Sequence, residues 1–114
     1  MTDRELLELA AKAAGMEGYY WYQGSQSLTI GADWGMDSKR GSAWNPLVND
    51  GDALRLAVKL GILIAPPAYN GGWEATASAK ADDGRWIDER SGTHDEATRR
   101  AIVRAAAEIG RAMP

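Results

Sequence analysis

The chain has 114 residues, of which 45% are hydrophobic and 25% are charged, as in an ordinary globular domain. This length fits a single domain over residues 1–114, because two half-sized domains would each bury too small a core. No apolar run approaches the roughly 18 residues that cross a bilayer, and the acidic N-terminus lacks the basic and apolar parts of an export signal. We therefore expect a cytoplasmic protein that does not enter membranes.

The composition also excludes several kinds of chemistry. The chain has no Cys, so it forms no disulfide, no zinc site built on thiolates and no cysteine nucleophile. Thirteen Lys and Arg against sixteen Asp and Glu give a net charge of −3, whereas tight non-specific DNA binding normally needs a basic surface. The overall charge therefore argues against such DNA binding.

Three segments have the apolar spacing of amphipathic helices, and they are predicted over residues 2–14, 50–60 and 93–112. The first and third open with capping boxes, in which a Thr hydroxyl and a Glu carboxylate three residues later satisfy free backbone N–H groups. The second has a wide apolar arc, which indicates a helix buried on more than one side.

Aromatic, β-branched and alternating runs predict about five short strands between the helices. One hairpin is expected over residues 19–22 and 28–30, a single strand over 62–65, and a second hairpin over 73–80 and 85–89. The alternating alanines of the second hairpin leave room for a helix to pack closely. This order, α-β-β-α-β-β-β-α, predicts an α+β fold with three helices covering one small, mostly antiparallel sheet.

Residues 31–50 show no usable period and are predicted to be a long loop, with Trp44 anchored against the core. The chain has five Trp and four Tyr but no Phe, and Trp and Tyr favour interfaces because each carries a polar atom. Exposed Trp and Tyr are rigid anchors for protein partners, and the candidates are Tyr20, Tyr22, Trp34 and Trp44. The alternative is that these residues fill the core that the alanine-rich helices leave short of bulk.

A second candidate surface follows the last predicted helix and consists of Arg99, Arg100, Arg104 and Arg111. Such a stripe beside exposed aromatic residues can bind nucleic acid. Glu96 and Glu108 share this face and dilute its positive potential, so a solvated helical face is the alternative.

No reactive constellation is visible in the sequence. His94 is the single histidine and lies in a capping box beside Asp95, which is typical of an exposed cap residue. The spacing of Asp33 and Asp37 does not continue as a calcium loop, and no glycine-rich phosphate-binding motif occurs. We expect no metal, no cofactor and no enzymatic activity.

Three stretches of the sequence resemble a known family: residues 2–15, residues 44–47 (WNPL) with 50–60, and residues 97–110. They are similar to the opening, the central signature and the closing helix of uncharacterised tailed-phage and prophage proteins that have a helix–sheet–helix (ABA) sandwich domain, near the NinX-like group. The resemblance implies a phage or prophage origin and this layered architecture. It transfers no catalytic residue, because the matching positions are caps and apolar stripes.

Together these observations predict a non-catalytic phage or prophage accessory protein that binds a host or phage protein. A host-defence inhibitor of the anti-CRISPR kind is the sharpest form of this hypothesis. The alternative is a nucleic-acid-associated protein that uses the arginine face of the last helix.

Overall fold

The computed structural model describes residues 1–16, 20–23, 26–30, 42–65, 77–81, 84–90 and 92–114, which form an α+β fold. The first half of the chain contains α1 (Asp3–Ala13), β1 (Tyr20–Tyr22), β2 (Ser27–Ile30) and β3 (Ser42–Trp44). The second half contains α2 (Asp50–Leu60), β4 (Leu63–Ala65), β5 (Ala77–Lys80), β6 (Ile87–Glu89) and α3 (His94–Ala112).

The predicted helices are confirmed, and side-chain caps set where they begin. The hydroxyls of Thr2 and Thr93 accept hydrogen bonds from the backbone N–H groups of Glu5 (3.1 Å) and Glu96 (3.2 Å), as the two capping boxes predict. Asn49 caps α2 in the same way through the N–H of Asp52, at 2.9 Å. These bonds satisfy N–H groups that have no partner inside the helix.

The strands form two antiparallel sheets of three strands each, in the orders β1-β2-β3 and β4-β5-β6. Leu28 on the central strand of the first sheet pairs with Trp21 and Trp44, and Ala79 on that of the second pairs with Ile64 and Ile87. Leu28 and Ala79 are fully buried.

The α+β class is confirmed and the number of about five strands is roughly right, but the strands form two sheets and not one. The described residues contain six strands in two sheets. The additional strand is β3, over residues 42–44, where the sequence predicted a loop. The predicted strand over 73–80 is observed from Ala77 onward, and its first four residues lie outside the described ranges.

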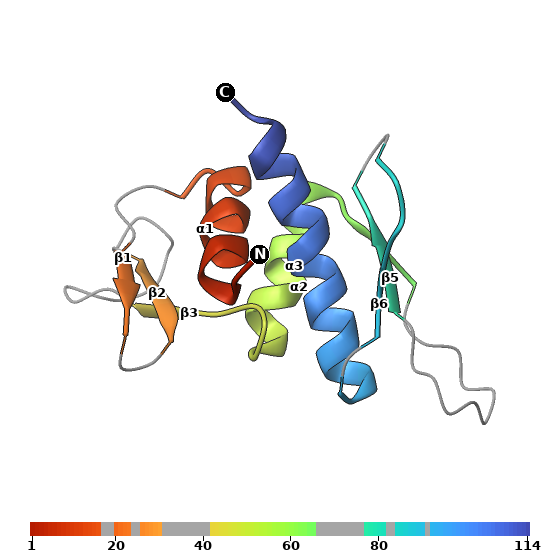
Figure 1. Ribbon diagram of the computed structural model, residues 1–114, viewed down its shortest axis with the longest axis horizontal. Coiled ribbons are helices and arrows are strands. Elements are labelled where there is room, and N and C mark those ends of the chain that lie inside the picture. The colour runs from red at the N-terminus through yellow and green to blue at the C-terminus, as the bar shows by residue number, and fades with distance from the viewer. Residues whose placement is uncertain (17–19, 24–25, 31–41, 66–76, 82–83, 91) are drawn as a thin grey trace.

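The helices occupy the middle of the molecule and the two sheets lie on either side of them (Figure 1). α3 packs against α1, α2 and all three strands of the second sheet, while the first sheet contacts α1 through β2. This layering reverses the helix–sheet–helix order that the family resemblance implies. The physical reason is that α3 is buried on most of its circumference, so it needs neighbours on several sides.

Small residues allow α3 to approach its neighbours closely. The buried positions of α3 are mostly alanines, and Gly110 lies so close to the backbone carbonyl of Leu9 in α1 that a Cβ at this position would overlap it. Ala79 on β5 is fully buried on the other side of the helix layer, as the alternating alanines predicted. Within the described ranges, no helix is both long and apolar enough to span a bilayer.

Replacing Gly110 with Ala is expected to lower the free energy of unfolding by about 1–3 kcal/mol, because the added methyl group meets the Leu9 carbonyl. The sign of this change is informative, because a Gly-to-Ala substitution in an unobstructed helix raises the free energy of unfolding by about 1 kcal/mol. Urea denaturation measures the difference. Glu108→Ala, at an exposed position of the same helix, serves as control with a change below about 0.5 kcal/mol. A more stable Gly110→Ala protein would contradict the close helix contact.

Candidate functional site

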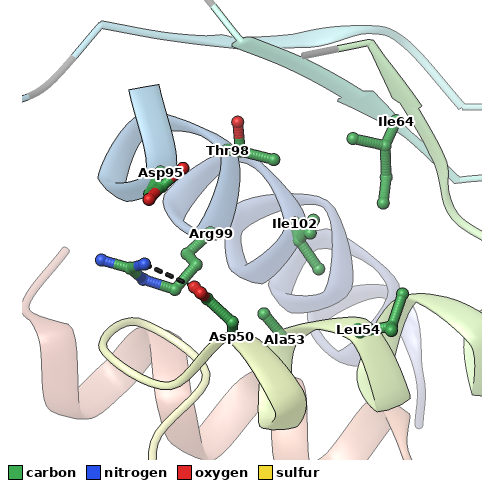
Figure 2. A pocket seen from close by; sticks show the side chains of 8 residues that line it. All are labelled: Asp50, Ala53, Leu54, Ile64, Asp95, Thr98, Arg99 and Ile102. Carbon is green, nitrogen blue, oxygen red and sulfur yellow. Dashed lines mark hydrogen bonds and ion pairs between the residues drawn. The ribbon is translucent and has the colours of Figure 1, made fainter. Parts of the chain in front are cut away.

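An open groove of about 360 Å³ lies between α2, α3 and β4. Figure 2 shows Ile64 of β4 pointing toward the space beside Leu54 of α2 and Ile102 of α3. The complete lining consists of Asp50, Ala53, Leu54, Ile64, Asp95, Thr98, Arg99 and Ile102. We call this surface the α2–β4 groove.

The groove has an apolar floor and an apolar rim. Ala53 and Ile102 are buried at 2% and 3% exposure, Ile64 is half-buried, and Leu54 at the rim is 60% exposed. Val58, one helical turn beyond Leu54, is 73% exposed. Single exposed apolar residues are common on proteins, but a group of them beside a hollow marks a surface suited to binding.

The rim exists because α2 is covered on one side only. Its buried apolar residues are Ala53, Leu56 and Ala57, and among the described elements α3 alone packs broadly on it. The expectation that α2 is buried on more than one side is therefore wrong. The second sheet packs against α3. In the described part of the chain, α2 has no broad contact with this sheet, so Leu54 and Val58 are exposed to solvent.

An ion pair closes the end of the groove where α2 and α3 begin. Arg99 Nη1 lies 2.6 Å from Asp50 Oδ1, and Arg99 Nε donates to the backbone carbonyl of Leu47 at 2.9 Å. The Arg99 side chain is only 15% exposed, whereas that of Asp50 is 77% exposed. These bonds hold the start of α2 against α3 and so fix the distance between the two walls.

The Thr98, Asp50 and Arg99 side chains of the groove are engaged in structural bonds, while Asp95 is exposed in the first turn of α3. The Thr98 hydroxyl donates to the carbonyl of His94 at 2.8 Å, and the Asp50 carboxylate is paired with Arg99. The described residues contain no group of three or more His, Cys, Asp or Glu side chains that could hold a metal ion. The arrangement is suited to binding apolar side chains next to a paired charge.

The four residues of the predicted aromatic site do not share one environment in the structure. Trp44 is 4% exposed and belongs to the core, as its expected anchoring role requires, so it supports β3 and offers little surface to a partner. Tyr20 and Tyr22 are at the ends of β1, but their side chains lie outside the described part of the structure, as does the whole of Trp34. For these three residues the partner-binding role stays a prediction.

The four arginines of the predicted nucleic-acid face are each paired with a carboxylate: Arg99, Arg100, Arg104 and Arg111. Arg100 lies 3.0 Å from Asp3 of α1, and Arg104 lies 2.7 Å from Glu89 of β6. These pairs connect α3 to its neighbours and reduce the positive potential available to a phosphate backbone. The nucleic-acid alternative stays a prediction, and the ion pairs weigh against it.

Comparison with protein-family models, with curated proteins and with solved structures finds no match for this chain. The resemblance to the phage ABA-sandwich proteins therefore stays a prediction that depends on the three stretches of sequence. The α2–β4 groove has to be interpreted from its own geometry.

Arg99→Ala is expected to lower the free energy of unfolding by about 1–3 kcal/mol, because it leaves the partly buried Leu47 carbonyl without its donor. Arg111→Ala removes an exposed pair at 3.6 Å on the same helix and should change stability by less than about 1 kcal/mol. Chemical denaturation of the two variants measures this contrast. Equal losses would show that Arg99 does not brace the groove.

Proposed function

We propose that this chain is a non-catalytic phage or prophage accessory protein that acts by binding another protein through the α2–β4 groove. The observation that carries this proposal is the exposure of Leu54 and Val58, one turn apart on α2, beside the hollow that Ile64 and Ile102 line. Covering such side chains is favourable by about 25 cal/mol per Å² of apolar area removed from water.

Binding is favoured over catalysis because of the state of the polar groups. A general base or nucleophile needs a free partner within hydrogen-bond reach. In the groove, the Asp50 carboxylate is paired with Arg99 and the Thr98 hydroxyl donates to a backbone carbonyl. The remaining carboxylate, that of Asp95, is exposed in the first turn of α3, where no His or free nucleophile accompanies it in the described lining. The apolar rim, by contrast, has the character of a contact surface whose centre excludes water when a partner docks.

The phage assignment depends on the three resembling stretches of sequence, two of which form most of the groove. Residues 50–60 supply its α2 wall and residues 97–110 supply most of its α3 wall. A partner encoded by the host or the phage fits this assignment. Inhibition of a host defence protein, in the anti-CRISPR manner, is the most specific form of the same proposal.

The groove is tested by a direct titration. A protein captured by the wild-type chain from bacterial lysate is identified by mass spectrometry, produced separately and titrated by calorimetry. Leu54→Asp should weaken binding about tenfold or more, because a carboxylate would be buried in an apolar contact. Met113→Asp is the matched control, since Met113 is also exposed and apolar but follows the far end of α3, and its affinity should be unchanged.

Circular dichroism first confirms that both variants are folded. Equal affinity of the wild-type and Leu54→Asp proteins would show that the partner binds elsewhere on the chain. Chemical conversion of the partner during the titration would contradict the non-catalytic proposal.

A further inference from the structure

The two edges of the second sheet differ in how they are protected. β4 and β6 are its outer strands, since the order is β4-β5-β6. On β6 the edge carries Asp88 and Glu89, and Arg104 donates a hydrogen bond to the backbone carbonyl of Asp88 at 2.9 Å. Charged side chains and covered backbone groups are the usual means of blocking further strand pairing. The β6 edge is therefore protected by charge and by one bonded carbonyl.

Within the described ranges the β4 edge carries no charged side chain, and its protection is limited to its length of three residues and to the prolines that follow it in the sequence. Its three residues are Leu63, Ile64 and Ala65, all uncharged and apolar, and in the described part of the chain β4 is paired with β5 alone. Leu63 is 55% exposed and Ala65 is exposed. Among the described residues, one side of β4 therefore has no strand partner, which leaves the backbone N–H and C=O groups on that side for pairing with another extended chain.

The pleat of β4 places this edge directly beside the groove. Ile64 pairs with the fully buried Ala79 and lines the groove, whereas Leu63 pairs with Lys80 on the opposite face of the sheet. A strand laid next to β4 would send alternate side chains to these two faces, because successive residues of a strand point in opposite directions. One set would therefore enter the groove next to Leu54.

We propose that the segment of the partner that binds here is an extended chain that adds to β4 as a fourth strand of the sheet and places alternate apolar side chains in the α2–β4 groove. The inference rests on the proposed function and specifies its partner. Strand addition is a recurrent mode of peptide recognition, in which backbone hydrogen bonds provide affinity and side-chain pockets provide specificity.

A strand fits this site better than a helix because of its backbone. An extended segment has free N–H and C=O groups that complement the β4 edge, while the backbone groups of a helix are already bonded within the helix. The sequence also limits the length of the pairing, since β4 is followed by Pro66 and Pro67, which have no N–H to donate. The segment should therefore need only a short run with apolar residues at alternate positions.

The absence of cysteine from the chain makes the geometry directly testable. A peptide that binds the wild-type protein is selected from a random peptide library and resynthesised with Cys at each position in turn. Each version is mixed with Leu63→Cys protein in a glutathione redox buffer, and the disulfide-linked product is measured by mass spectrometry. Cross-linking should peak at the peptide position opposite residue 63 and recur weakly two positions to either side, with the adjacent positions unlinked, because residues of one face recur with a period of two and only near neighbours meet disulfide geometry.

Three controls define the site. Asp88→Cys, on the β6 edge, should give no patterned cross-linking to the same peptides. Leu54→Asp should lower the affinity of the selected peptide about tenfold or more, since the groove receives its side chains. If Leu63→Cys fails to fold, Ala65→Cys supplies a thiol on the same face of β4.

The other outcomes overturn the inference. A cross-linking period of three to four positions means that a helix occupies the groove, which leaves the proposed function intact. A Leu63→Cys protein that dimerises without peptide, together with a wild-type dimer in ultracentrifugation, means that a second copy covers the edge. Failure to select any peptide also overturns strand addition, whereas the proposed function is judged separately by the titration of the captured protein.

Discussion

The close contact between α1 and α3 is the constraint on which the rest of the arrangement depends. These two helices share the most extensive contact of the described elements, and at Gly110 the backbone of α3 lies against the carbonyl of Leu9. Such proximity is possible only where side chains are small, because larger ones would force the helix axes apart. The alanines of α3 extend the same property to its other sides, so the sheet containing β5 also packs closely on it.

The position of the groove follows from this central role of α3. Because α1, α2 and the second sheet all pack against α3, α2 contacts the rest of the described structure mainly along the side that faces α3. Its remaining apolar residues, Leu54 and Val58, are left next to β4 with nothing in the described part of the chain covering them. The ion pair between Asp50 and Arg99 then holds α2 in place at the end of the groove. Binding surface and core are therefore two consequences of one packing arrangement.

The charged residues of α3 illustrate how a surface pattern changes its meaning in three dimensions. In the sequence, the arginines form a stripe that could attract phosphate. In the structure, Arg99, Arg100 and Arg104 reach Asp50, Asp3 and Glu89 on three other elements. A long side chain with several donors is well suited to this, because it can bridge elements while covering apolar surface with its stem. These three ion pairs therefore connect α3 to α2, α1 and β6.

Local patterns by themselves determined much of this protein. The three helices, their capping residues and the two hairpins were predictable because capping bonds and apolar periodicity involve residues that are near one another in the chain. The burial of Trp44 was also predictable, since a large aromatic residue in an irregular segment gains most from the core.

Only the tertiary structure decided the division into two sheets, the placement of the helices between them and the exposure of Leu54. β3 is three residues long, too short for a recognisable alternation, and it forms because β2 offers an edge to pair with. Likewise, the sequence of α2 shows how much apolar surface the helix has, but not how much of it a neighbour covers. Coverage depends on contacts between segments distant in the chain, and no local pattern encodes them.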